Sequence, residues 1–437
     1  MRKIILAFTA LFVSRAAYAQ STTTFWQAIG DTTLSRLVTD ALRTGTTVRL
    51  AEARVDEARA SHKLASFDYA PTVTASGSAL RTRQSMAQVP GLTSPLPERD
   101  LYDVGFDATW ELDVFGRVRR TVGAQGARVE SAEHSLDDAQ VGLSAEVGLT
   151  YFELRGAQRQ LGVARRNAEV QQKTVALTED RLAAGRGTAF DVERAKSVLQ
   201  LTLAAVPALE TQIAASRYRL ASLIGHADVS VGDLSADAPV LALPDISLPD
   251  TIVRHRPDVL AAEREVAAQA LAVGAARADY LPRIGVGAST GYTADRVQSL
   301  TRTGTSRITF GPVVSFPLLD LGRVRQRLSV VQALQAEAQT RYTATVLRAQ
   351  EESQTGVVAY DRARERVRLL SEAVKSSEHA LALAQQRFEA GLTDFLQVLD
   401  AQRTTLDAES QLANAQTAAS TALVALYKAT GGAGSVR

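Results

Sequence analysis

The chain has 437 residues, and 49 Lys and Arg against 47 Asp and Glu leave a formal net charge of +2. This near balance gives no electrostatic reason to expect a nucleic-acid partner. Aromatic residues make up only 5% of the chain, whereas Ala, Arg, Gln and Glu are abundant. That composition is typical of long helices that pack closely through small side chains.

The first 19 residues have the pattern of a secretory signal peptide. Arg2 and Lys3 precede the apolar run 4–13, and an Ala-Tyr-Ala cleavage site ends just before Gln20. The run is too short to persist as a membrane-spanning helix, although an N-terminal anchor helix is the alternative. Because the chain contains no cysteine, we expect no bacterial lipid anchor. No later stretch has the roughly 18 uninterrupted apolar residues of a transmembrane helix, so further membrane contact must be made by strands.

Residues 20–225 form a first predicted repeat. It contains, in order, a short helix over 34–66, a strand pair at about 72–82 and 103–114, and a long helical hairpin over 118–223. In the second strand, apolar Val104, Phe106 and Trp110 alternate with acidic residues. A strand of bilayer length with one apolar and one acidic face fits a wall with lipid outside and water inside. A soluble β-domain with one face against a core is the alternative.

A second repeat over 257–430 has the same order, after a linker over 226–256 that is rich in Pro and Asp and is predicted to form an equatorial region. It contains a short helix over 258–279, strands at about 283–293 and 307–318, and a helical hairpin over 322–429. Gly116-Arg117-Val118-Arg119 recurs as Gly322-Arg323-Val324-Arg325, and further matches keep one constant offset, so the two hairpins are equal in length. The tail 431–437 is predicted to be disordered.

The hairpin limbs are too long for a compact globular domain. The limb from residue 322 to 390 would reach roughly 100 Å as a helix, and its apolar residues follow three- and four-residue steps. Coiled-coil packing in a tube or filament is therefore predicted. Pro207 predicts a kink in the return limb of the first hairpin.

Four strands cannot close a barrel. An open sheet in lipid would leave two edges of unpaired N–H and C=O groups, each costing several kcal/mol. Bacterial barrels begin at about eight strands, so two, three or four protomers could complete one. Self-association is thus predicted from hydrogen-bond accounting, without fixing the number of subunits.

No catalytic, cofactor or metal site is predicted. The five histidines stand apart from one another, and no phosphate-binding glycine loop occurs. Met1 and Met86 are the only methionines, which gives no support for a thioether path for soft metals. We therefore expect a protein that is not an enzyme.

Three groups of residues resemble the TolC-like outer-membrane efflux proteins, and in particular the OprM-like branch. They are the run 111–120 (ELDVFGRVRR), the run 254–259 (RHRPDV), and Gly391-Leu392-Thr393-Asp394 followed by 398–402 (VLDAQ). The resemblance extends over nearly the whole mature chain. It implies a mainly α-helical homotrimer in which four strands per protomer form a shared 12-stranded β-barrel in the outer membrane, continued by a periplasmic α-helical barrel.

The same resemblance implies a function and partners. The chain would be the exit duct of a tripartite efflux system, working with a periplasmic adaptor and an inner-membrane pump of the resistance-nodulation-division type. It would export drugs or other small molecules passively across the periplasm and the outer membrane of a Gram-negative bacterium. Many OprM-like proteins carry a lipid on an N-terminal cysteine, and this chain departs from them in lacking one.

The hairpin tips are the periplasmic gate and the adaptor-docking region in this family. The matching tip residues are Gly185, Arg186, Gly187, Thr188, Gly391, Leu392, Thr393 and Asp394. The matching gate residues are Arg387, Phe388, Gln397, Asp400, Asp191 and Arg194. TolC itself has two inward aspartates where this chain has Gln397 and Asp400, so a different lock is expected, with Asp400 paired to Arg387 or Arg194. Gly185 and Gly391 should adopt positive φ at the reversals.

The strand pattern also predicts an acidic barrel lining, made by Asp103, Asp107, Glu111 and Asp113, that favours cations. Several alternatives remain open. An ordinary solvated coiled-coil end would explain the tip residues. A TolC-like duct for type I protein secretion, a periplasmic adaptor, or a structural coiled-coil protein would explain the long helices.

Overall fold

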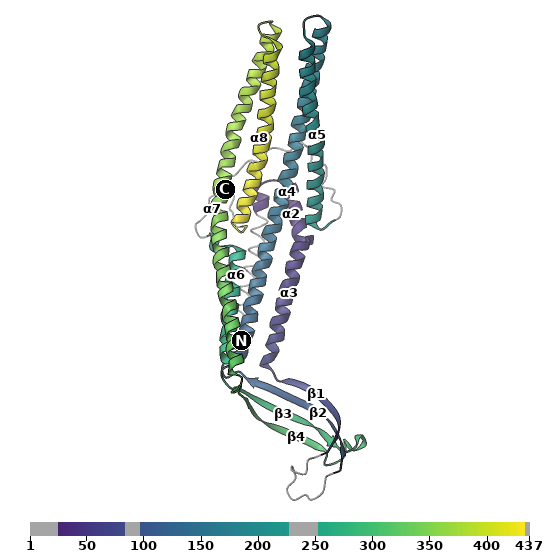
Figure 1. Ribbon diagram of the computed structural model, residues 1–437, viewed down its shortest axis with the longest axis vertical. Coiled ribbons are helices and arrows are strands. Elements are labelled where there is room, and N and C mark those ends of the chain that lie inside the picture. Colours follow the sequence, from purple (N-terminus) through teal and green to yellow (C-terminus); the bar gives the residue numbers. More distant parts are fainter. Residues whose placement is uncertain (1–24, 84–96, 227–251, 433–437) are drawn as a thin grey trace. The chain divides into compact units, whose positions relative to one another are not determined.

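The computed structural model describes residues 25–83, 97–226 and 252–432 (Figure 1). The predicted signal peptide, most of the linker 226–256 and residues 433–437 lie outside the described residues. The chain divides into two compact units, one made of residues up to 53, 134–260 and from 344 onward, the other of 54–133 and 261–343. Each unit therefore draws on both sequence repeats.

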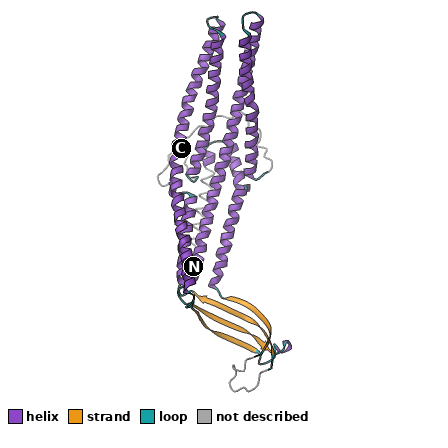
Figure 2. Cartoon of the chain, in the orientation of Figure 1, coloured by secondary structure: helices purple, strands orange, loops and turns teal. Residues whose placement is uncertain are grey.

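The second unit contains the sheet. Its strands are β1 (Thr72–Thr82), β2 (Arg99–Leu112), β3 (Arg283–Ala294) and β4 (Ser306–Ser315), paired antiparallel in the order β1-β2-β3-β4 (Figure 2). Two predicted ends need correction: β2 stops at Leu112 instead of 114, and β4 stops at Ser315 instead of 318. Pro317 has no N–H for a strand ladder, and Asp113 leaves the strand to cap the following helix.

The register gives the sheet two chemically distinct faces. Asp107 lies opposite Thr74 on β1 and Ser289 on β3, and Gly287 lies opposite Gly311. All of these residues share the polar face. The other face carries large apolar side chains that are exposed in the single chain, among them Val104, Phe106, Trp110, Ile308, Phe310 and Val314. The two-faced alternation predicted from the sequence is therefore present.

Four helices precede or follow the strands in the sequence. They are α3 (Thr46–Ser66), α4 (Arg117–Ala183), α6 (Pro257–Ala278) and α7 (Leu321–Glu389). In the second unit, the Ser131 hydroxyl on α4 donates to the carbonyl of Ala261 on α6 at 2.8 Å, and Arg59 on α3 pairs with Glu133 on α4 at 2.5 Å. The helix predicted over 34–66 is two helices, α2 (Thr32–Thr44) and α3, separated by Gly45.

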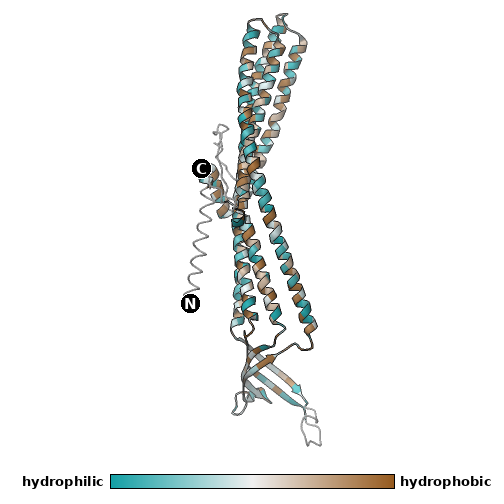
Figure 3. Ribbon diagram, turned by 90° about the vertical axis from the view of Figure 1, so that its left-hand side faces the viewer, coloured by the Kyte–Doolittle hydropathy of each residue, from teal (hydrophilic) through white to brown (hydrophobic). Residues whose placement is uncertain are grey.

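The first unit contains two long antiparallel helix pairs. Helix α5 (Ala189–Ile224) runs back beside α4, and α8 (Phe395–Ala429) runs back beside α7 (Figure 1). Figure 3 shows polar and apolar residues alternating along these helices, as expected for coiled-coil packing. Helix α5 is unbroken through Pro207, and 18 of its residues reach a mean hydropathy of 1.3 with only 6% of them buried. By length and composition alone it could cross a membrane, which is weak evidence in a helical hairpin.

An aromatic cluster forms the core of the first unit. Phe25 stacks on Tyr427 with ring centroids 4.4 Å apart, and Trp26 meets both rings edge-on. Gly148 on α4 permits this contact, because a Cβ there would lie 2.4 Å from the indole ring of Trp26. The Tyr151 hydroxyl donates to Asp31 at 2.6 Å, and Asp31 also caps α2. These contacts fix the beginning of the described chain to α4 and α8.

The C-terminal end of α8 is held by a buried arginine from the sequence RHRPDV. Arg256 is 6% exposed and donates twice to Asp258, at 3.0 and 2.8 Å, and once to the carbonyl of Ala429 at 2.9 Å. It also pairs with Glu352 on α7 at 2.8 Å. Burial works to lower the pKa of Arg256, but hydrogen bonds and charge interactions with Asp258 and Glu352 raise it overall.

Two residues of the tail 431–437, which was predicted to be disordered, are ordered in the structure. Gly431 and Gly432 are buried, both have positive φ, and the Gly432 N–H donates to the carbonyl of Tyr427 at 3.0 Å. The prediction is wrong for these two residues because they end α8 with the αL geometry that glycine allows.

Candidate functional site

The two hairpin tips reverse with the same backbone motif. Gly185 has φ 68° and Gly391 has φ 72°, as predicted. At the first tip the N–H of Arg186 donates to the carbonyl of Arg181 at 2.9 Å, and at the second the N–H of Leu392 donates to that of Arg387 at 2.9 Å. Each bond runs five residues back along the helix, which is the Schellman ending. Both tips therefore depend on a glycine.

After each reversal, an N-cap residue begins the returning helix. The Thr188 hydroxyl accepts from the N–H of Asp191 at 3.2 Å, while the Asp191 carboxylate accepts from the N–H and hydroxyl of Thr188 at 3.2 and 2.6 Å. On the second hairpin, the Asp394 carboxylate accepts from the N–H of Gln397 at 3.2 Å. Asp191 and Asp394 thus have a structural use as helix caps.

The two hairpins contact each other at their tips through an arginine and aromatic rings. The Arg181 guanidinium on α4 lies 4.0 Å from the ring centroid of Phe388 on α7, and Phe388 lies 5.4 Å from Phe395 on α8. This cation–π contact places a charge from one hairpin against a ring of the other. Sequence reasoning placed Arg181 at the start of the first tip and Phe388 among the gate residues but did not pair them, because only the fold brings the two together.

A cavity of about 530 Å³ lies beside this contact. Its lining includes Arg181, Arg186, Phe190, Asp191, Arg194, Phe388, Thr393, Asp394 and Leu396. Phe190 and Leu392 are each 70% exposed at the tips, which is unusual for large apolar side chains. The sequence prediction named Leu392 as a tip residue but did not name Phe190. The tip therefore combines an arginine-rich hollow with exposed apolar side chains.

The expected ion-pair lock is not formed within the chain. Among the described residues, Asp400 has no ion-pair contact with Arg387 or Arg194, although Arg194 and Asp400 line the same two cavities. Gln397 and Asp400 are both exposed on α8. A role for these residues in gating thus remains a proposal.

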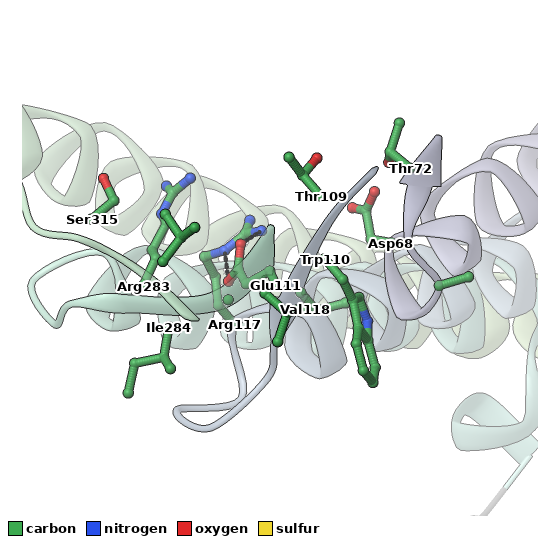
Figure 4. Close-up of a pocket in the computed structure, with 14 residues that line it drawn as sticks. Asp68, Thr72, Thr109, Trp110, Glu111, Arg117, Val118, Arg283, Ile284 and Ser315 are labelled. Atoms are coloured by element: carbon green, nitrogen blue, oxygen red, sulfur yellow. Dashed lines mark hydrogen bonds and ion pairs between the residues drawn. The ribbon is translucent and has the colours of Figure 1, made fainter. Parts of the chain in front are cut away.

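Two of the four carboxylates of the predicted acidic lining are paired with basic side chains. Asp103 pairs with Arg307 across β3 at 2.6 and 2.9 Å, and Glu111 pairs with Arg117 at 2.9 and 2.7 Å (Figure 4). The Asp113 carboxylate accepts from the first N–H groups of α4, so it caps that helix instead of lining the strand face.

Asp107 differs from the other three carboxylates. It accepts from the Ser76 hydroxyl at 2.7 Å, and no basic side chain in the described residues pairs with it. It therefore forms no ion pair among the described residues, although the charge of Arg307 also acts on it.

No metal centre is indicated by the described part of the chain, where no three His, Cys, Asp or Glu side chains gather at ligand distance. A cavity of about 320 Å³ at the base of the sheet contains Asp68, Glu111, Arg117 and Arg283, with Trp110 at its side (Figure 4). Three of its four charged groups are paired: Glu111 with Arg117, and Arg283 with Asp279 at 2.7 Å, while the charge of Asp68 interacts with that of Arg117. This pattern suits a joint between strand and helix better than a ligand site.

A sheet with one lipid-like face, followed by two long helical hairpins, defines the class of outer-membrane channels that combine a β-barrel with a helical barrel. The family model described as "Outer membrane efflux protein" matches residues 37–226 and 248–432. The chain belongs to this family.

Relatives of known name agree with the assignment. Outer membrane protein OprJ of Pseudomonas aeruginosa is 31% identical over 413 residues, covering 93% of this chain and 86% of OprJ. Solvent efflux pump outer membrane protein SrpC of Pseudomonas putida is 29% identical with the same coverage.

Solved structures show the same fold. The outer-membrane channel OprN superposes with a TM-score of 0.85 at 36% identity, covering 93% of this chain and 92% of that one. VceC from Vibrio cholerae gives a TM-score of 0.85 at 26% identity, covering 93% and 98%. The fold class and the outer-membrane location predicted from the sequence are thus confirmed.

Proposed function

We propose that this outer-membrane efflux protein is the passive exit duct of a tripartite system that exports drugs or other small molecules. The observation that carries the proposal is the pairing of a four-stranded sheet of bilayer length with two hairpins of nearly equal length. The sheet supplies one sector of a barrel wall, and the hairpins supply one sector of a helical tube. A duct needs no catalytic group, only a lining and a closure.

Self-association follows from the unpaired groups of the sheet. β1 and β4 are its two edges, and in lipid their free N–H and C=O groups must pair with another strand. Three copies would give a 12-stranded barrel, the number that the family resemblance implies. Exposed apolar side chains on the helices need cover as well: Leu201 on α5 is 72% exposed, and Leu347 and Val358 on α7 are each 60% exposed.

Partners are proposed at the tips. The exposed Phe190 and Leu392, with the arginine-lined hollow beside them, offer an apolar and cationic surface for the helices of a periplasmic adaptor. An inner-membrane pump, of the resistance-nodulation-division type, would deliver the cargo. Opening would require the α7–α8 hairpin to move outward relative to the α4–α5 hairpin, driven by contact with the adaptor.

Small apolar molecules are the cargo that the named relatives favour. SrpC is named for a solvent efflux pump, and TtgI of Pseudomonas putida for a toluene efflux pump. We propose that this chain serves the same kind of export instead of protein secretion.

The test is reconstitution of the purified protein in planar bilayers. We expect extraction only with detergent, an oligomeric mass of three chains, and discrete conductance steps that Phe190→Ala leaves unchanged. The same variant should lose drug export in cells that supply an adaptor and a pump, because it affects docking and not the duct. A water-soluble monomer without conductance would overturn the proposal.

A further inference from the structure

Buried polar side chains gather on α4 and α8 in the part of the hairpins that is closer to the tips. Far from the tips, α4 and α8 meet through Leu154, Leu423 and Val424, all fully buried. Closer to the tips, five of the buried side chains on these two helices are polar: Gln171, Thr174 and Thr178 on α4, and Gln402 and Thr405 on α8. We call these five residues the polar seam.

Hydrogen bonding within the polar seam is incomplete. The Gln402 amide donates to the Thr174 hydroxyl at 3.3 Å, and that hydroxyl donates to the carbonyl of Val170 at 3.1 Å. Gln171 is only 4% exposed, yet neither its amide nitrogen nor its amide oxygen has a protein hydrogen-bond partner among the described residues. A buried amide is costly unless it is hydrogen-bonded, so a partner outside the chain is indicated.

A cavity lies next to this amide. It has a volume of about 80 Å³ and is lined by α4, α5 and α8, with Gln171, Thr174, Val198, Leu399, Gln402 and Leu406 among its walls. A water molecule needs roughly 10–15 Å³ and two to four polar partners, and the cavity meets both conditions. Arg194 and Asp400, two predicted gate residues, also belong to its lining.

We infer that the cavity is a binding site for ordered water, held by the amide of Gln171, and that this water forms the joint at which the two hairpins separate. The inference deepens the proposed function and rests on it, because the proposed function supplies the outward movement of the α7–α8 hairpin. Water bonded to the seam can exchange partners as α8 moves away from α4, whereas a dry leucine interface would lose its contacts outright. The polar seam therefore lowers the cost of opening close to the tips.

The consequence can be tested with a substitution of nearly the same volume. Gln171→Leu removes the unpaired amide and dries the cavity, so it should favour the packed, closed arrangement. Gln172→Leu is the matched control, because Gln172 is the next residue on α4 and is exposed. In planar bilayers we expect the open probability of Gln171→Leu to fall at least about fivefold, with unitary conductance unchanged, while Gln172→Leu stays at the wild-type value.

Water itself is detected by hydroxyl-radical footprinting of the full-length protein in detergent. Leu399 and Leu406 are half-buried cavity residues, and bound water should make them react more than their exposure predicts. We expect this excess oxidation in the wild type and in Gln172→Leu, and its loss in Gln171→Leu. Wild-type oxidation no greater than exposure predicts would overturn the water site.

The two readouts separate two kinds of failure. Excess oxidation together with equal open probabilities in all three proteins would overturn the joint. A wild type that never conducts would instead overturn the proposed function, and footprinting would still decide the water site. If Gln171→Leu does not fold, Gln171→Met, which also removes the amide at nearly the same volume, should show the same loss of oxidation at Leu399.

Discussion

Replacing the buried arginine of the RHRPDV motif should release the end of α8. Arg256→Met keeps the aliphatic bulk but removes the charge that pairs with Asp258 and Glu352 and the donor to the carbonyl of Ala429. The Asp258 side chain, which is only 14% exposed, then loses its main ion-pair partner. Loss of one partner from a buried ion pair costs about 3–5 kcal/mol. We expect the lower end, about 3 kcal/mol, because Glu352 is 43% exposed and is partly solvated already.

The assay is urea unfolding of the detergent-solubilised protein, followed by loss of helical circular dichroism. Arg348→Met is the matched control. Arg348 is 63% exposed and its ion pair with Asp258 is long, at 4.0 Å, so the substitution should lower the free energy of unfolding by less than about 1 kcal/mol. Adding Asp258→Asn to Arg256→Met should recover part of the loss, because the uncompensated carboxylate disappears. Equal stability of Arg256→Met and Arg348→Met would refute the reasoning.

Three further predictions concern the tips and the strand face. Gly391→Ala forces a Cβ into the left-handed region, so it should destabilise the tip by about 1–2 kcal/mol and speed proteolysis there. Arg181→Leu removes the cation–π contact with Phe388, worth about 0.5–1 kcal/mol, and should raise the open probability two- to fivefold in planar bilayers. Arg307→Gln leaves Asp103 uncompensated, so the reversal potential in a KCl gradient should shift toward that of potassium.

Each of these has a control in the chain. Gly322→Ala, a glycine inside α7 with open space around its Cβ position, should leave proteolysis unchanged. Lys196→Leu removes an exposed charge on α5 and should not alter the open probability. Arg302→Gln, in the turn between β3 and β4, should shift the reversal potential less than Arg307→Gln. Equal effects of variant and control would contradict the assigned role in each case.

The architecture could be predicted from the sequence because the motifs that mark it are short and occur once in each of the two repeats. The repeat of Gly116-Arg117-Val118-Arg119 as Gly322-Arg323-Val324-Arg325 marks both junctions between strand and helix, and α4 and α7 begin within it or next to it. The alternation along β2 gave the two faces of the sheet. Glycine at residues 185 and 391 predicted positive φ, and both have it.

The partners of the site residues could not be predicted, because they depend on register and on contacts between distant segments. Arg307 lies on the polar face by its alternation, but only the alignment of β3 between β2 and β4 brings it to Asp103. Arg181 reaches Phe388 only through the packing of two hairpins that are far apart in sequence. Asp400 has no ion partner within the described chain, and a contact between subunits cannot be found from one chain's pattern.

The most direct test of the barrel is a disulfide scan between the two edges of the sheet. The chain has no cysteine, so a cysteine introduced on β1, at Thr74, Ser76 or Ser78, or on β4, at Thr309, can form a disulfide only with another introduced cysteine. If β1 of one copy pairs with β4 of the next, oxidation in outer membranes should give covalent dimers and trimers for at least one pair, and nothing larger. Only monomers for every pair, in a protein that stays in solution without detergent, would contradict the account.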